Sequence, residues 1–337
     1  MSRHTVFNSR HTSNKTVKKL IGITMGDPKG IGPEIIIKSI RKLDSSITDR
    51  IRIYGDPSVF EKAYKLVGSD TIRLNFASTS DSINHPQKMS EMEAAKTTFT
   101  ALNRAISDAN SDQLGAIVTA PVNKSRLNLV CPNFRGHTEY LASESGIQDP
   151  TMIFISVGKE KEIPVLSLVT THAPIADLPK MITRKTVLST ILKTFEMMKE
   201  YTGRSNIRIA VAALNPHAGE NGFLGREEIE TIQPAIMDGQ GRGVNCEGPF
   251  PADSLFNQSN FAKYDAIVAM YHDQGLIPLK ASGMGNTVNF TAGLPFIRTS
   301  PAHGTAEDIA WSGSADESSM LSAIKVTDKC LSRKGRI

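Results

Sequence analysis

Three apolar segments of this chain each lead into a histidine. The segments span 165–172, 207–217 and 264–272, and their final residues are His172, His217 and His272. Near-continuous apolar runs predict strands that are buried on both faces of a parallel sheet. Ligands of open α/β sheets bind beyond the carboxyl ends of such strands. Because neutral imidazole is a common metal ligand, we expect the three rings to converge there on a divalent cation, although an ordinary hydrogen bond could explain any one of them.

Strand-like and helix-like segments alternate along the rest of the chain. Strands are predicted at 20–25, 51–54, 72–76, 116–119 and 152–156, and helices at 35–43, 90–109, 183–201, 226–237 and 306–331. Ser90 and Glu93 have the spacing of a capping box at the start of one of these helices. The alternation predicts βαβ units and therefore an α/β fold with a mostly parallel sheet.

Length and charge narrow the class of protein. The 337 residues are enough for about two domains. The net charge of +5 is small, and beyond the amino-terminal segment the basic residues are scattered, so we expect no nucleic-acid partner. No uncharged apolar stretch approaches about 18 residues, so we also expect no membrane partner.

The cysteines and the amino-terminal segment bear on the cellular compartment in which the protein is expected. Cys131, Cys246 and Cys330 show no C-x-x-C spacing, which argues against a disulfide framework and against a thiolate metal site. A cytoplasmic location fits this sparse set best. Residues 1–19 contain neither an acidic residue nor an apolar signal core. We expect a disordered tail there, with a transit peptide as the alternative.

Residues 26–34 form a glycine-rich segment between the first predicted strand and helix. Its glycines allow close backbone approach, Pro33 suits the first turn of a helix, and a helix N-terminus can hold an anion. The segment is neither a G-x-G-x-x-G motif nor a P-loop. A tight strand-to-helix turn without a ligand explains it equally well.

Cationic and amide side chains suggest an anion site. His137 and Thr138 follow a glycine in a short polar segment, and Lys280, Asn289 and Arg298 recur at intervals of nine residues. Arginine binds phosphate or carboxylate through two parallel hydrogen bonds, and lysine adds a point charge. We therefore expect Lys280, Asn289 and Arg298 to clamp an anion. A helix cap at Thr138 and chance surface charge are the alternatives.

Three further residues are candidates for proton transfer. Segment 271–275 places Asp273 beside a histidine of the opening set, where a carboxylate can orient the imidazole ring. Asp253 offers a second carboxylate, although a helix N-cap would also explain it. Lys124 follows a predicted strand, and a lysine with a perturbed pKa can act as a general base. Asp253, Asp273 and Lys124 are therefore the catalytic candidates.

Taken together, the polar segments resemble one enzyme family. Five motifs stand in the order seen in the 4-hydroxythreonine-4-phosphate dehydrogenase family of vitamin B6 biosynthesis. They are Gly-Asp-Pro-Lys-Gly-Ile-Gly-Pro-Glu, Gly-His-Thr-Glu, Asn-Pro-His-Ala-Gly-Glu, Tyr-His-Asp-Gln-Gly and Gly-Leu-Pro-Phe-Ile-Arg-Thr-Ser. No single motif is specific to this family, but the combination of the five motifs is. The resemblance runs from about Lys19 to the end of the chain.

This resemblance implies a fold, a domain division and an oligomer. The fold would be that of the isocitrate and isopropylmalate dehydrogenases, with two α/β domains and an active site in the cleft between them. Residues 20–128 plus 300–337 would form the first domain, and 129–299 the second. The implied assembly is a homodimer in which the partner subunit completes the active site.

The resemblance also implies roles for individual residues. His172, His217 and His272 match divalent-metal ligands, His137, Thr138, Lys280, Asn289 and Arg298 match substrate contacts, and His303, Gly304, Thr305 and Ala306 match the cofactor loop. The cofactor would be NAD or NADP, and the metal zinc, magnesium, manganese or cobalt. A glycine turn that only caps a helix is the alternative for the four cofactor-loop residues.

Two residues depart from the family pattern. Lys29 replaces a small residue in the first glycine turn, and Ala302 stands where the family usually has an aspartate before His-Gly-Thr. The second change could alter the cofactor contacts.

The implied reaction is the oxidation and decarboxylation of 4-phosphohydroxy-L-threonine to 3-amino-2-oxopropyl phosphate. A divalent cation would act as the Lewis acid, and the cationic clamp would hold the phosphate. D-threonate or D-erythronate 4-phosphate is an alternative substrate in the same family. An alternative of another class is a non-redox protein, either an acyltransferase or a metal-dependent protein that binds a phosphorylated metabolite.

Overall fold

One sheet runs through the molecule. The computed structural model describes residues 19–68, 74–77, 85–158, 164–261, 263–281 and 286–334. Its strands are β1 (Leu20–Thr24), β2 (Ile51–Tyr54), β3 (Asn75–Ala77), β4 (Leu114–Thr119), β5 (Thr151–Val157), β6 (Val165–Leu168), β7 (Arg208–Ala212), β8 (Asn245–Phe250), β9 (Ala266–Ala269), β10 (Asn286–Ala292) and β11 (Ile297–Pro301). Within the described residues they form an 11-stranded sheet in the order β3-β2-β1-β4-β11-β10-β5-β6-β9-β7-β8.

The sheet is mostly parallel, as predicted. The antiparallel pairs are β5 with β6, β5 with β10, and β10 with β11. Strands β6, β9 and β7 are neighbours and run parallel, so their carboxyl ends lie at one edge. His172, His272 and His217 follow these three strands in that order. The prediction that the three apolar segments are parallel strands with histidines beyond their ends is confirmed.

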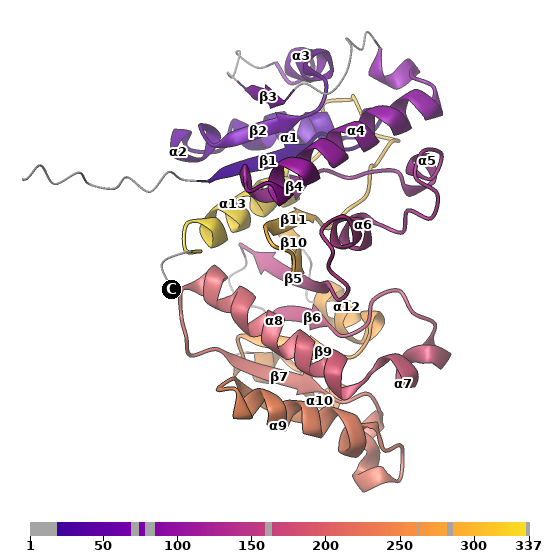
Figure 1. The fold of residues 1–337 in the computed structure, drawn as a ribbon, viewed down its shortest axis with the longest axis vertical. Helices are drawn as coiled ribbons and strands as arrows, with labels where there is room; N and C mark the ends of the chain where they lie inside the picture. The colour runs from indigo at the N-terminus through magenta and orange to yellow at the C-terminus, as the bar shows by residue number, and fades with distance from the viewer. Residues whose placement is uncertain are drawn as a thin grey trace, which may run out of the picture.

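Helices cover both faces of the sheet (Figure 1). They are α1 (Gly32–Ile40), α2 (Ser45–Thr48), α3 (Pro57–Leu66), α4 (Glu91–Asn110), α5 (Lys124–Leu127), α6 (His137–Glu144), α7 (Leu178–Met181), α8 (Arg184–Thr202), α9 (Gln233–Gly241), α10 (Ala252–Leu255), α11 (Gln258–Phe261), α12 (His272–Ala281) and α13 (Ser318–Leu331). The capping box predicted at Ser90 and Glu93 is present at the start of α4. Within the described residues, no helix combines the length and the apolar character that crossing a bilayer requires.

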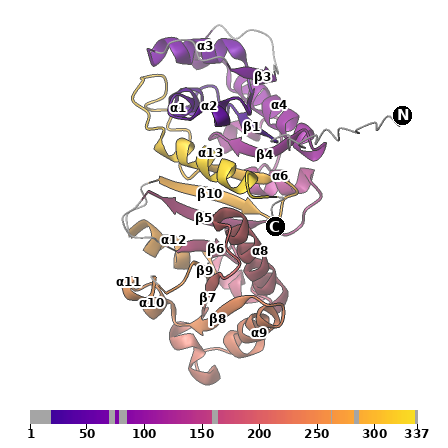
Figure 2. The same cartoon turned by 90° about the vertical axis from the view of Figure 1, so that its left-hand side faces the viewer.

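Two strands from the C-terminal part of the chain, β10 and β11, join the two halves of the molecule. Strand β11 pairs in parallel with β4, and β10 pairs in the antiparallel sense with β5. Figure 2 shows α13 crossing the middle of the molecule beside these strands. Because the sheet continues without a break through both halves, the domain boundaries near 128 and 300 remain predictions.

Alternate side chains of the strands feed cores on opposite faces. On β4, Val118 joins one core and Ile117 joins a second. On β5, Ile153 joins the same first core, whereas Phe154 joins a third. One face therefore carries a continuous core beneath α1, α13 and α8, and the other face carries two separate cores. Between those two cores, the face is not covered by an apolar core, so polar side chains can lie there.

Some predicted elements need correction. The segment 306–331 was expected to be helical, but α13 begins only at Ser318. Ala306, Trp311 and Gly313 have φ angles of 42°, 62° and 79°, and such left-handed residues interrupt an α-helix. The strand predicted at 72–76 begins outside the described residues, and β3 covers its end.

The segment predicted as a helix at 226–237 is also irregular. It contains a π-helical turn at Glu228–Ile232 before α9 begins.

Candidate functional site

A pocket of about 350 Å³ lies between the two separate cores, beyond the carboxyl end of β4. Its size is within the range of small-molecule sites. Helices α6 and α12 and strands β5, β10 and β11 supply its walls. The structure brings ten of the predicted site residues to this pocket: Lys124, His137, Thr138, His172, His272, Lys280, Asn289, Arg298, His303 and Gly304.

Arg298 is the most unusual of these residues, because it is only 2% exposed. Its Nη1 donates to Thr291 Oγ1 at 2.9 Å, and its Nη2 donates to Thr119 Oγ1 at 2.7 Å. Burial lowers the pKa of this guanidinium to about 10, so it remains charged at neutral pH. No carboxylate of the described residues forms an ion pair with it. A buried charge that is held only by hydroxyl groups calls for an anion as its partner.

Three polar atoms around this pocket have no hydrogen-bond partner among the described residues. They are Arg298 Nε, His137 Nε2 and Asn289 Oδ1. Buried polar atoms are normally paired, since an unpaired one costs about 1–3 kcal/mol. The three atoms combine two nitrogens and one carbonyl oxygen, which suits a ligand that carries both acceptors and a donor.

His137 is expected to stay neutral in the ligand-free protein. Burial, with the charges of Arg298 and Lys124, places the pKa of its imidazole well below 6.5. We therefore expect its ring resonances in a histidine NMR titration to keep their neutral-form shifts as the pH falls through 6.5. Below pH 6.5 His137 binds a proton in the unfolded chain but not in the folded chain. The free energy of unfolding therefore falls as the pH is lowered. A titration midpoint near 6.5 would contradict the buried environment of this ring.

His172 and His272 face one another in the pocket. Their ring centroids are 5.7 Å apart, and a metal–nitrogen bond spans about 2 Å, so both rings can reach one cation. His272 Nδ1 lies 2.7 Å from Asp273 Oδ1, which leaves Nε2 for a ligand. A carboxylate that orients a metal-binding imidazole is typical of metal sites. The role of Asp273 itself stays a prediction.

His217 does not line this pocket. Within the described residues, no group of three or more histidine, cysteine or acidic side chains could hold an ion. One chain therefore does not bring the three histidines together, and a site shared between two subunits stays a prediction. His217 begins a left-handed run in which residues 217–222 all have positive φ angles. Such backbone costs about 1–2 kcal/mol for each residue with a side chain.

Glu228 fixes the backbone directly before this left-handed run. The carboxylate is 3% exposed and accepts hydrogen bonds from the backbone N–H groups of Leu214 and Asn215, each at 2.8 Å. At Gly219 an added Cβ would lie 2.7 Å from Glu228 Oε2, so only glycine fits. Strained backbone held in this way is frequent at functional sites.

The other two catalytic candidates, Lys124 and Asp253, lie in different parts of the structure. Lys124 lines the pocket at the start of α5, next to the strand end that carries Thr119. Asp253 lies exposed in the first turn of α10 and does not line the pocket in this single chain. The catalytic role of each remains a prediction.

The predicted cofactor loop lies at the rim of the pocket. His303 and Gly304 line it, whereas Thr305 turns toward the first glycine-rich segment, where the Ile31 N–H donates to the Thr305 carbonyl at 3.0 Å. The expected helix directly after this loop is absent, because residues 307–310 form turns. Ala302, the second departure from the family pattern, is exposed beside the pocket.

Sequence reasoning missed several residues of the pocket. Thr119, Glu139 and Ser300 line it, and Thr291 contacts Arg298. Thr119 ends β4 and Ser300 lies near the end of β11, so the rule on carboxyl ends of strands could have found both. Threonine and serine within strands otherwise carry no signal that separates them from ordinary strand residues.

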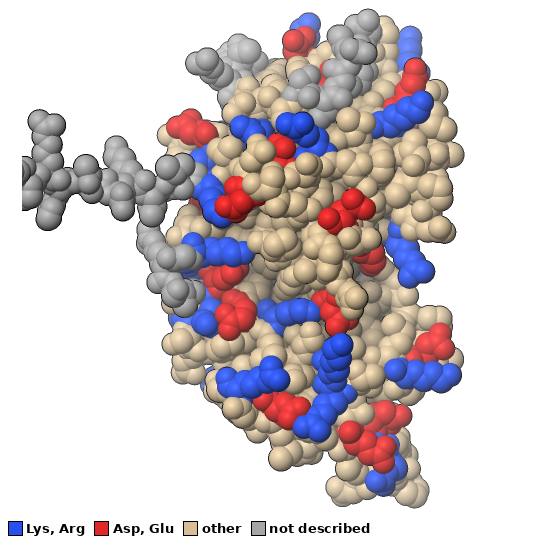
Figure 3. Space-filling model, viewed as in Figure 1, with Lys and Arg blue, Asp and Glu red and all other residues tan. Residues whose placement is uncertain are grey.

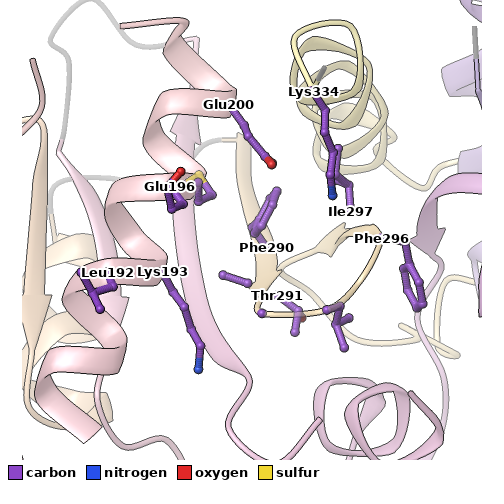
Figure 4. A pocket seen from close by; sticks show the side chains of 13 residues that line it. Leu192, Lys193, Glu196, Glu200, Phe290, Thr291, Phe296, Ile297 and Lys334 are labelled. Atoms are coloured by element: carbon purple, nitrogen blue, oxygen red, sulfur yellow. The ribbon is translucent and has the colours of Figure 1, made fainter. Parts of the chain in front are cut away.

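A second pocket lies on the opposite face of β10, between α8 and the end of α13 (Figure 4). Its lining is mainly apolar, with Phe290, Phe296 and Ile297 between Lys193 and Lys334. None of the predicted site residues contributes to it. On the face seen in Figure 3, the described acidic and basic side chains are intermixed.

Comparisons with known proteins point to one family. A model of the family described as pyridoxal phosphate biosynthetic protein PdxA matches residues 47–327. A 4-hydroxythreonine-4-phosphate dehydrogenase of Desulforapulum autotrophicum is 37% identical over 335 aligned residues, covering 94% of this chain and 95% of that protein. A D-threonate 4-phosphate dehydrogenase of Pectobacterium atrosepticum is 36% identical over 328 aligned residues, covering 92% and 98%.

Solved structures show the same architecture. The 4-hydroxythreonine-4-phosphate dehydrogenase of Klebsiella pneumoniae has a TM-score of 0.78 at 35% identity, covering 95% of this chain and 99% of that chain. A β-decarboxylating dehydrogenase of Thermococcus kodakarensis shares the fold with a TM-score of 0.54 at 16% identity, covering 91% and 81%. The predicted dehydrogenase-type α/β fold is confirmed.

Proposed function

The chain belongs to the pyridoxal phosphate biosynthetic protein PdxA family, as its sequence motifs predicted, and on that premise we propose that it oxidises 4-phosphohydroxy-L-threonine. The nearly equal identities of the hydroxythreonine-phosphate and D-threonate-phosphate relatives leave the four-carbon acid open. Both substrates are phosphorylated hydroxy acids, which share the chemistry that the pocket would recognise.

The observation that carries this proposal is the buried charge of Arg298. Its unpaired Nε, together with Lys280 and Lys124 in the same pocket, supports a site for a phosphate or carboxylate. His137 Nε2 and Asn289 would contact the remaining polar atoms of the substrate. Binding energy from such remote groups orients the reacting carbon.

The chain's own residues also fit a divalent cation. His172 and His272 would hold it, with Asp273 orienting the second ring. When bound, the cation supplies Lewis-acid stabilisation to the oxygen of the alcohol that is oxidised. Two imidazoles leave zinc, magnesium, manganese and cobalt open, and His217 of the partner subunit would complete the set.

Residues 303–306 would hold a nicotinamide dinucleotide, which would supply the hydride acceptor for the oxidation. His303 and Gly304 lie at the pocket rim, next to the groups that would hold the substrate. The oxidised product is a β-keto acid, which loses carbon dioxide to give 3-amino-2-oxopropyl phosphate. NAD is the first choice, with NADP as the alternative.

An absorbance assay at the NADH band tests the proposal. Purified protein is given NAD and either 4-phosphohydroxy-L-threonine, D-threonate 4-phosphate or D-erythronate 4-phosphate, with and without a chelator. We expect chelator-sensitive reduction of NAD, with the highest kcat/KM for the hydroxythreonine phosphate. A higher kcat/KM for one of the sugar acids would reassign the substrate. No reduction with any of them, alongside tight binding of one, would favour the non-redox alternative.

We also propose a homodimer, and exposed apolar side chains mark a surface for it. Phe223 is 84% exposed directly after the run that carries His217, and Leu224 and Ile229 lie nearby. Replacing Phe223 by glutamate should shift the protein toward the monomer in sedimentation experiments and reduce activity. The control is Leu129→Glu, an exposed apolar residue in the other half of the molecule. An unchanged dimer in Phe223→Glu would place the interface elsewhere.

A further inference from the structure

The loop that would carry the cofactor receives little support from secondary structure. It extends from the end of β11 to α13, and its left-handed residues Ala306 and Trp311 prevent a continuous helix. Its shape must therefore be held by contacts with other segments.

Two of these contacts are made to the glycine-rich segment 26–34. The Trp311 Nε1–H donates to the Pro28 carbonyl at 3.0 Å. At Gly30 an added Cβ would lie 3.0 Å from both Thr305 Cβ and the Thr305 carbonyl oxygen, so glycine permits the close approach. These contacts fix the two sides of the loop but leave its middle unsupported.

Arg126 holds the middle of the loop through Glu307. The Arg126 side chain is 4% exposed, and its Nη2 donates to Glu307 Oε2 at 3.0 Å. Asn123 Nδ2 donates to the other oxygen of the same carboxylate at 2.8 Å. Because both oxygens are engaged, Glu307 is fixed in position and orientation.

The same guanidinium binds two other segments. Its Nε donates to Glu91 Oε2 at 2.7 Å at the start of α4, and its Nη1 donates to Asp27 in the glycine-rich segment. Lys29 also pairs with Glu91, so a second cation joins the three carboxylates. This contact gives a structural role to Lys29, one of the two departures from the family pattern.

We propose that Arg126 is a positioning residue for the dinucleotide, which it serves by holding residues 303–307 against the glycine-rich segment through Glu307. This inference rests on the proposed function, which assigns the loop to the cofactor. Arg126 itself does not line the pocket and would not touch the reacting atoms.

The test variant is Glu307→Gln, which keeps the shape of the side chain and leaves Arg126 paired with Asp27 and Glu91. The matched control is Asp238→Asn, whose carboxylate is 30% exposed and binds Arg184, compared with 35% for Glu307. We expect the Kd for NADH and the KM for NAD to rise about 10- to 100-fold in Glu307→Gln, as the loss of one charge-assisted hydrogen bond implies, with kcat little changed. The control should match the wild type.

A second readout needs neither cofactor nor turnover. Trp311 is the single tryptophan of the chain and lies on the loop, so its emission reports the state of the loop. We expect acrylamide to quench it more strongly in Glu307→Gln and in Arg126→Lys than in the control. The combined variant should quench no more than Arg126→Lys alone, because Arg126→Lys already disrupts the contact that Glu307→Gln weakens.

Unchanged quenching in Glu307→Gln, or an unchanged Kd for NADH, would overturn the role of Arg126. Failure of the proposed function is distinguishable from this result. In that case the wild type would reduce no NAD with any substrate, whereas the acrylamide experiment would still show whether Arg126 holds the loop.

Discussion

Replacing Arg298 by glutamine is expected to lower kcat/KM for the phosphorylated substrate by about 10²- to 10⁴-fold. Two charge-assisted hydrogen bonds to an anion contribute about 1.5–3 kcal/mol each, and each 1.4 kcal/mol corresponds to about a factor of 10. The loss should appear mainly in KM if the arginine binds ground and transition states equally, and in kcat if its contact tightens in the transition state. Steady-state kinetics over a range of substrate concentrations separates the two.

Folding must be monitored in the same variant, because Arg298 is fully buried. The thermal midpoint should change little, since the substitution removes a buried charge that only hydroxyl groups compensate. Arg242→Gln is the control, as an exposed arginine just beyond α9. Wild-type kcat/KM in a well-folded Arg298→Gln protein would remove the principal support for the anion site.

Replacing His272 by alanine is expected to lower kcat/KM by about 10³-fold or more, because Lewis-acid catalysis contributes several kcal/mol. His172→Ala should behave in the same way, since the two rings would share one cation. Asp273→Asn should have an intermediate effect of about 10- to 100-fold on metal affinity, because it removes only the group that orients His272. Metal titration by calorimetry, together with the metal content of each purified variant, measures these effects.

The control for the histidine variants is His85→Ala, an exposed histidine directly before the short helical turn at Pro86–Lys88. It should keep the metal content and activity of the wild type. Equal metal content in the wild type and in His272→Ala would show that the cation, if required, binds elsewhere. Full activity after exhaustive chelation would dismiss the metal altogether.

The sequence predicted the layout of the fold well where local patterns carry the information. The apolar segments before His172, His217 and His272 form strands whose residues are buried on both faces of the sheet. A near-continuous apolar run predicts such burial from the sequence alone. The sequence predicted less well where conformation depends on distant contacts. The irregular stretch before Ser318 looks helical by composition, but contacts with residues of the first glycine-rich segment hold it in turns.

The order of the polar motifs was sufficient to determine the family, and the apolar periodicity was sufficient for the α/β class. Only the tertiary structure revealed that Arg298 is buried without a carboxylate partner in the described part of the chain and that His217 stands apart from the other two rings. It also revealed the contacts of Arg126, whose partners lie 99, 35 and 181 positions away. A local pattern encodes which face of a strand or helix is buried, whereas the charge environment of a side chain depends on segments that only folding brings together.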